Sequence, residues 1–276
     1  MKKLCLSLLI IVIVGVGGFF AYNYFFKDNL NYIMIDINPS VQLGVNEDDK
    51  VVEVVALNED ADILLSDMNL EDMELEEAVD SIVDEAVEIG YIDEFSNENQ
   101  VVVSSCLEKK QKRLEYENKI SERIRKRLEN RNVYAEVLSN GVTDEIKAEA
   151  DEVGVSYGKM LLIERAVTLN PELDKNELLN SSIKDIQTEI TSKVKERRKL
   201  ISDDAKELEE ILDQMKEEKI ENRNNKLNQI KEEVIEKYED NLDEVDSNER
   251  ETIINNLIEQ RKKDIFNQRK NNKGRN

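Results

Sequence analysis

The chain has 276 residues, and its 39 Lys and Arg stand against 61 Asp and Glu, which leaves a formal net charge of −22. His is absent from the sequence, so mechanisms that need an imidazole, such as Ser-His-Asp and Cys-His nucleophiles or His-ligated zinc, are excluded. The acidic balance also argues against nucleic acid as a partner, because phosphate carries the same sign of charge.

An apolar run without a charge extends from Leu4 to Phe26. At 1.5 Å per residue it can cross a hydrocarbon core of ~30 Å, and it exceeds the roughly 7 to 15 residues of a signal-peptide core. We therefore predict an uncleaved transmembrane helix over 4–26 rather than a cleaved signal peptide. Lys2 and Lys3 precede the run, so the positive-inside rule makes residues 1–3 a cytoplasmic stub and places the bulk of this single-pass protein outside the cell membrane.

Residues 28–105 contain 22 acidic side chains and a single basic one, Lys50. A solvated exterior is the simplest interpretation, and a specific cation site is the alternative. The sequence has no recognisable phosphate loop, metal-ligand cluster or pair of catalytic carboxylates, so we predict neither a cofactor nor a metal site.

Alternating and β-branched residues predict five short strands. They cover Tyr32–Ile37, Val41–Val45, Val51–Leu57, Gln100–Cys106 and Val133–Leu138. The first three follow one another so closely that consecutive antiparallel hairpins are expected.

Apolar residues three and four positions apart predict helices around this sheet. One begins at Leu75 and ends at Gly90, and a second, rich in basic residues, spans Leu107–Asn132 and should lie over the acidic remainder of its own domain. Two more cover 143–152 and 156–169. The fold class is therefore α+β, a small antiparallel sheet with packed helices, in a domain over residues 28–182.

Residues 183–266 are charged and helical, with expected breaks at 202–204 and 240–247. Apolar positions recur in steps of three, four and seven but with slips, which favours a helical bundle or a loose coiled-coil region over one long rod. A spacer is the simplest role for this region, and a contact with an envelope protein is the alternative. Residues 267–276 are expected to be a disordered tail, because they are too polar to fold alone.

The segment from Ile35 to Asn46 reads IDINPSVQLGVN. It resembles the extracytoplasmic juxtamembrane domain of RsgI-type anti-sigma factors. The stretches KVVEVVALNED from Lys50, LEEAVDSIVDEAVEIGY from Leu75 and VGVSYGKMLLIERAV from Val153 strengthen the resemblance, which covers about residues 28–170.

The resemblance implies autoproteolysis at the Asn38–Pro39 bond. Pro39 has no N–H, so the usual deamidation route is closed, whereas the side-chain amide nitrogen of Asn38 can attack its own main-chain carbonyl and expel the proline nitrogen. A distorted amide in a tight turn would leave more easily. Asp36 and Ser40 are the polar neighbours that could support the reaction, and an ordinary Asn-Pro turn is the structural alternative.

By resemblance, cleavage would leave two fragments held without a covalent bond and would link the chain to a sigma factor. That link is expected to be indirect or to go through a segment missing from this sequence, because only Met1, Lys2 and Lys3 precede the apolar run, whereas the family has a cytoplasmic sigma-binding segment. A single self-cleavage would not make the chain an enzyme in the turnover sense. The alternatives are an uncleaved, membrane-anchored structural protein and an envelope ligand sensor.

Overall fold

The computed structural model describes residues 30–107, 110–139, 144–155, 157–238 and 246–273. The expected cytoplasmic stub, 1–3, and transmembrane helix, 4–26, lie outside these ranges. Within them, none of the helices combines the length and the apolar character that crossing a bilayer requires.

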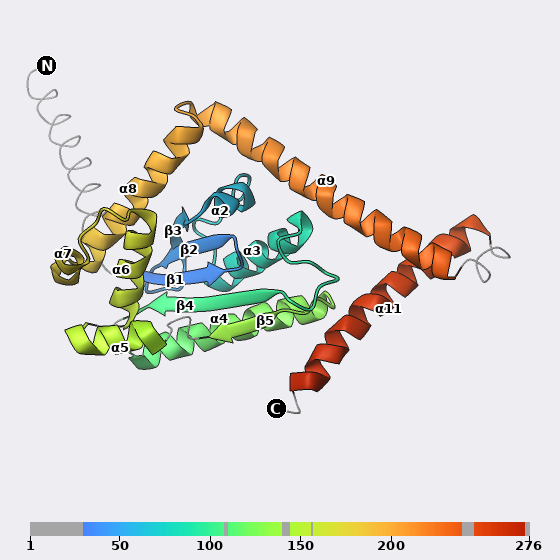
Figure 1. The fold of residues 1–276 in the computed structure, drawn as a ribbon, viewed down its shortest axis with the longest axis horizontal. Coiled ribbons are helices and arrows are strands. Elements are labelled where there is room, and N and C mark those ends of the chain that lie inside the picture. The colour runs from blue at the N-terminus through green and yellow to red at the C-terminus, as the bar shows by residue number, and fades with distance from the viewer. Residues whose placement is uncertain (1–29, 108–109, 140–143, 156, 239–245, 274–276) are drawn as a thin grey trace, which may run out of the picture.

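A five-stranded sheet forms the centre of the domain (Figure 1). Its strands are β1 (Asn31–Asp36), β2 (Ser40–Val45), β3 (Val51–Ala56), β4 (Gln100–Cys106) and β5 (Glu136–Ser139), arranged in the order β3-β2-β1-β4-β5. The two expected hairpins, β1–β2 and β2–β3, are confirmed, and β1 also pairs antiparallel with β4. Strand β1 therefore lies in the middle of the sheet, although it is the first strand in the described part of the chain.

The prediction of an antiparallel sheet is wrong for the last pair, because β5 runs parallel to β4. Helix α4 (Lys110–Asn130) connects these two strands and carries the chain back to the starting end of β4. Parallel neighbours need such a crossover, whereas a tight turn gives an antiparallel pair.

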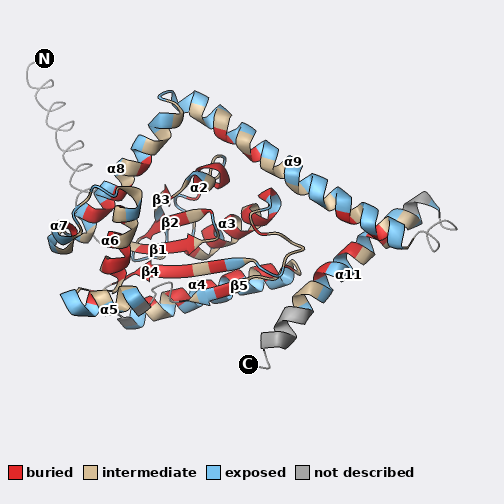
Figure 2. Cartoon of the chain, viewed as in Figure 1, coloured by how far each residue is buried: buried red, intermediate tan, exposed pale blue. Residues whose placement is uncertain are grey.

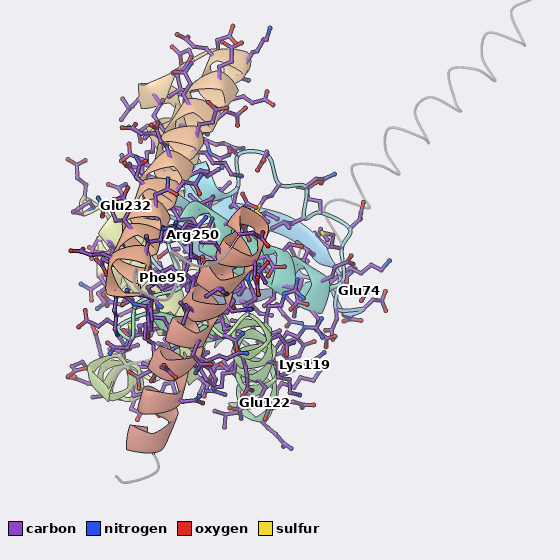
Figure 3. All side chains as sticks on the ribbon, turned by 90° about the vertical axis from the view of Figure 1, so that its right-hand side faces the viewer. Glu74, Phe95, Lys119, Glu122, Glu232 and Arg250 are labelled. Atoms are coloured by element: carbon purple, nitrogen blue, oxygen red, sulfur yellow. The ribbon has the colours of Figure 1, made fainter. Side chains whose placement is uncertain are left out.

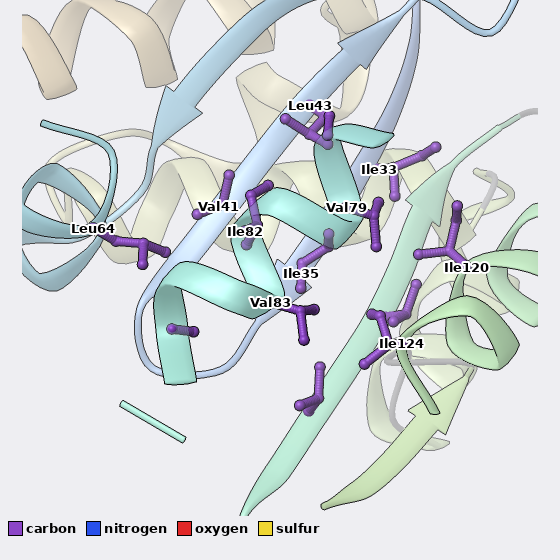
Figure 4. Packing of buried hydrophobic residues seen from close by; sticks show 14 of the residues in the cluster. Ile33, Ile35, Val41, Leu43, Leu64, Val79, Ile82, Val83, Ile120 and Ile124 are labelled. Atoms are coloured by element: carbon purple, nitrogen blue, oxygen red, sulfur yellow. The ribbon is translucent and has the colours of Figure 1, made fainter. Parts of the chain in front are cut away.

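One face of the sheet is covered by α3 (Leu75–Ile89) and α4. Ile33 and Ile35 of β1 share this core with Val79, Ile82 and Val83 of α3, and all five side chains are fully buried (Figure 4). Helix α3 ends as expected at Gly90, whose left-handed φ of 93° suits a residue without a Cβ.

The alternate residues of β1, Tyr32 and Met34, enter a second core on the opposite face. Helices α6 (Tyr157–Leu169) and α8 (Ile183–Ile201) supply its other side, with α5 (Asp144–Val153) and α7 (Lys175–Asn180) beside α6. The boundary expected after residue 182 thus falls inside a continuous core that includes α8.

The C-terminal arm, defined here as α9 (Ala205–Lys237) and α11 (Ser247–Lys273), frames the domain (Figure 1). Helix α9 packs on α3 and on α2 (Glu59–Leu64), a short helix that the sequence analysis missed, and α11 packs on α9. The break expected at 202–204 is confirmed, since Ser202 ends α8 and Asp204 caps α9. The backbone of the expected tail, 267–276, is helical as far as Lys273.

Buried residues concentrate in the sheet and its covering helices, whereas the arm is mostly exposed (Figure 2). A small apolar cluster joins α9 to α11 through Val234, Ile254 and Ile258, and Phe95 packs against it (Figure 3). Apolar burial by the arm is therefore limited, and charge contributes much of its attachment.

Basic side chains of the arm meet the acidic block of the domain. Lys216 Nζ lies 2.6 Å from Glu85 and also contacts Asp67. Glu94 accepts from both arm helices, from Arg223 of α9 at 2.5 Å and from Lys262 of α11 at 2.7 Å. Many acidic residues expected to face only solvent thus have partners within the chain.

The basic helix α4 neutralises another part of that block, as expected. Arg123 holds Asp80 at 2.6 Å, and Arg127 and Arg131 both contact Asp84 of α3. Burial would raise the pKa of Asp84, but its hydrogen bonds and ion pairs with the two arginines outweigh it and lower that pKa.

A buried carboxylate joins α8 to α2. Asp62 of α2 is 1% exposed, and it accepts from Arg197 and Arg198 at 2.7 Å each. The guanidinium of Arg197 also donates to the main-chain carbonyls of Ala56 at 2.9 Å and Leu57 at 3.0 Å, at the end of β3. Removing Arg197 would take this donor from the two carbonyls and would leave Asp62 with one of its two arginines.

We expect Arg197→Met to lower the free energy of unfolding by roughly 2 to 3 kcal/mol, because hydrogen bonds to a buried charge and to buried carbonyls are lost. Arg261→Met is the matched control, since Arg261 pairs with Glu233 at 3.0 Å at the surface and should cost less than about 1 kcal/mol. Denaturant unfolding of both variants checks the difference, and equal losses would contradict it.

The lowered pKa of Glu94 predicts that the attachment of the arm weakens at acid pH. Burial would raise the pKa of this carboxyl, but Lys262 and Arg223 together lower it below its ordinary value of 4.5. A carboxyl with a lowered folded-state pKa stabilises the fold above its unfolded pKa, and that stabilisation is lost as the pH falls through the folded pKa.

Glu94→Gln should therefore lower stability at pH 7 by roughly 1 to 2 kcal/mol, and the difference from the wild type should shrink as the pH falls below 4.5. Thermal unfolding of both proteins between pH 3 and 8 measures this change. Curves that stay parallel over the whole range would contradict it.

Candidate functional site

The Asn38–Pro39 bond lies in the turn between β1 and β2. Asp36 ends β1 and is paired with Ser40, the first residue of β2, so only residues 37–39 form the turn. The N–H of Ile37 donates to the carbonyl of Pro39 at 2.8 Å, which closes the turn around Asn38. The hairpin expected from the sequence thus places the bond at its tip.

Asn38 adopts a φ of 62°, in the left-handed region. Asn enters this region more readily than most residues, because its short polar side chain forms local hydrogen bonds. Asn38 is exposed, whereas Pro39 is buried. The side-chain amide that would attack is therefore reachable from solvent, and the proline that would leave is held by the fold.

Asp36 and Ser40, the two supporting residues expected from the sequence, bond to each other across the hairpin. Ser40 Oγ donates to Asp36 Oδ1 at 2.5 Å, and Arg165 of α6 donates to Asp36 Oδ2. These contacts tie both ends of the turn together and link β1 to α6. Asp36 and Ser40 thus brace the turn, in the sense that their contacts hold its two ends together beside the Asn38–Pro39 bond.

Asn58 is a residue of this site that the sequence analysis did not single out. It caps the N-terminus of α2, and its Oδ1 accepts from the N–H groups of Ala61 and Ser40, each at 3.0 Å. Its Nδ2 donates to Oδ1 of Asn38 at 3.4 Å. The acidic turn after Asn58 is a recognisable capping signal, but its contact with Asn38 exists only in the folded chain.

Arg165 was also missed, because its position on α6 has no distinctive spacing relative to the turn. It reaches Asp36, at the end of β1, because α6 packs against the sheet at β4, the neighbour of β1. Its long-range contact has no local signal in the sequence.

A cavity of about 330 Å³ opens beside the turn, lined by Ile37, Tyr91, Asn99 and Gln100 among others. The Tyr91 hydroxyl donates to Asp60 Oδ1 at 2.8 Å. Burial raises the pKa of Tyr91, and the Asp60 carboxylate adds to the effect, so the phenol stays protonated at neutral pH. The cavity reaches the turn at Ile37.

Comparison with known proteins relates this site to a family. The model of the anti-sigma factor RsgI-like central domain matches residues 30–165. Anti-sigma-I factor RsgI7 of Acetivibrio thermocellus is 30% identical over 178 residues, which are 64% of this chain and 32% of that protein.

Two further relatives give the same relation. RsgI4 of the same organism is 28% identical over 173 residues, covering 60% of this chain and 33% of that protein. Anti-sigma-I factor RsgI of Bacillus anthracis is 27% identical over 141 residues, covering 50% of this chain and 30% of that protein. The chain spans about a third of the length of each of these relatives.

Proposed function

The α+β domain of this chain belongs to the family of anti-sigma factor RsgI-like central domains, and from this premise we propose that the chain is a membrane signalling protein that cleaves itself once between Asn38 and Pro39. In this proposal residues 4–26 anchor the chain in the cell membrane with the N-terminus in the cytoplasm. The domain lies outside the membrane, and its link to a sigma factor is indirect.

The proposed reaction needs no external reagent for bond cleavage. Asn38 Nδ2 forms a bond to the main-chain carbonyl carbon of Asn38, and the bond from that carbon to the nitrogen of Pro39 breaks. One proton moves from Nδ2 to the proline nitrogen. The first fragment then ends in a succinimide, which water hydrolyses, and the second begins at Pro39. Because each chain reacts once, the protein is not an enzyme in the turnover sense.

The observation that carries this proposal is the conformation of the turn. Asn38 is exposed at a φ of 62°, Pro39 is buried, and the residues on either side, Asp36 and Ser40, are bonded together. A braced turn limits the motions of the reacting groups, so the entropy cost of bringing amide and carbonyl together is reduced in advance.

The position of β1 supports a non-covalent complex after cleavage. The first fragment would end just after β1, which hydrogen-bonds to β2 on one side and to β4 on the other. Its side chains Ile33, Met34 and Ile35 are at most 1% exposed. Two ladders and two cores would therefore have to be disrupted before the fragments could separate.

Signalling would follow from that separation. A load or a ligand acting on the outer fragment would be transmitted to β1, and loss of the outer fragment would leave a short membrane-anchored stub open to further proteolysis. The C-terminal region, α8 with the arm, is the proposed contact for an envelope protein, because it exposes most of its charged residues.

We expect the full chain, tagged at both ends and purified in detergent, to yield a fragment that begins at Pro39 under denaturing conditions. Intact mass and N-terminal sequencing measure it. Asn38→Gly is the control, since glycine accepts the left-handed φ and lacks the side-chain amide, and it should stay whole. If the wild type also stays whole after long incubation, self-cleavage is refuted, and an uncleaved structural protein or ligand sensor becomes the better account.

We expect the cleaved fragments to co-elute in native buffer and to separate in denaturant. Arg165→Met should release the N-terminal fragment several-fold faster, because Arg165 lies in the second fragment and holds Asp36 of the first. Arg123→Met is the matched control, since Arg123 and Asp80 both lie in the second fragment. Size-exclusion chromatography against time measures the release, and equal rates in the two variants would contradict this role of Arg165.

A further inference from the structure

The hydrogen bonds around Asn58 define which atom of its side chain faces the cleavage site. The N–H groups of Ser40 and Ala61 can only donate, so the Asn58 atom that meets both of them at 3.0 Å is the oxygen. The amide nitrogen of Asn58 must therefore lie on the other side, toward Asn38.

The same reasoning extends to Asn38. A donor from Asn58 has to meet an acceptor, so the Asn38 atom 3.4 Å away is Oδ1. The Nδ2 of Asn38 is then directed away from Asn58. Two backbone donors thus determine the orientation of two side-chain amides in series, and the second of them carries the proposed nucleophile.

We propose that Asn58 is a positioning residue for self-cleavage, in that its Nδ2 orients the Asn38 amide and stabilises the charge that forms on Asn38 Oδ1. This inference rests on the proposed cleavage at Asn38–Pro39. As Asn38 Nδ2 loses its proton and attacks, negative charge shifts to Oδ1 of the same amide. A fixed donor at that oxygen favours the attacking form, as donors do in an oxyanion hole.

Asn58 is itself held in place. Its backbone leads into α2, and the chain just before it is fixed by Arg197, which donates to the carbonyls of Ala56 and Leu57. The N–H of Leu57 donates to the carbonyl of Ser40 at 2.9 Å. The donor is thus preorganised by β2, α2 and α8, whereas Asn38 lies at an exposed turn.

The Asn58→Asp variant distinguishes a role of Asn58 in positioning the Asn38 amide from its role in capping α2. Aspartate caps helices as well as asparagine does, and its oxygens can still accept from Ser40 and Ala61, but at neutral pH it has no donor for Asn38. If Asn58 only stabilises the fold, the variant should cleave like the wild type. If it positions the nucleophile, cleavage at pH 7 should slow by at least about tenfold.

Lowering the pH should restore cleavage in the Asn58→Asp variant. Protonation of the carboxylate that Asn58→Asp introduces restores an O–H donor, so the ratio of variant to wild-type rate should rise as the pH falls toward about 4. The ratio is the readout, because the other carboxylates near the site, Asp36, Glu59 and Asp60, are the same in both proteins. Asn58→Ser is the second variant, since serine caps the helix without a charge and is too short to reach Asn38. Its rate ratio should be low at every pH.

The experiment measures cleavage of the full chain in detergent by intact mass, with thermal unfolding as a check of folding. Asn46→Asp is the matched control, because Asn46 accepts from Asp48 and Lys50 in the next turn, away from the bond. A wild-type rate for Asn58→Asp or Asn58→Ser at pH 7, or a slow Asn58→Asp rate without acid rescue, would overturn the inference. A wild type that never cleaves would refute the proposed function, and this inference with it.

Discussion

The two hydrogen-bonded ladders of β1 are the interaction on which the rest of the domain depends. Strand β1 pairs with β2 on one side and with β4 on the other. It therefore joins the β2–β3 hairpin to the parallel pair of β4 and β5. Its alternate side chains enter both cores, Ile33 and Ile35 on one face and Tyr32 and Met34 on the other. A strand in this position can be separated from its neighbours in the chain and still remain bound by the fold.

The proposed cleavage point suits that arrangement. The turn at Asn38 and Pro39 is the covalent connection between the central strand and everything that follows it. Breaking it would convert an intramolecular ladder into an interface between two fragments. The residues that brace the turn come from β1, β2, the start of α2 and α6, so each brace other than Asp36 would lie in the outer fragment.

Charge organises the molecule at a larger scale. The acidic block of the first half is met by basic residues from α4, α8, α9 and α11, through pairs such as Asp80–Arg123 and Glu94–Lys262. These contacts span more than forty positions of the chain. A charged helix beyond the core can therefore attach to the domain with little apolar burial.

Local pattern in the sequence determined the strands, the main helices and the turn that holds Asn38 and Pro39, because alternation, 3.6-residue periodicity and capping signals all act over a few residues. The resemblance to the RsgI-type domain singled out the Asn38–Pro39 bond. Only the tertiary structure decided that β1 is central, that β5 is parallel to β4, that α8 completes a core, and that Asn58 and Arg165 reach the turn. Each of these depends on residues brought together from distant parts of the chain, 20 positions for Asn58 and 129 for Arg165. No short stretch of sequence records such a distance.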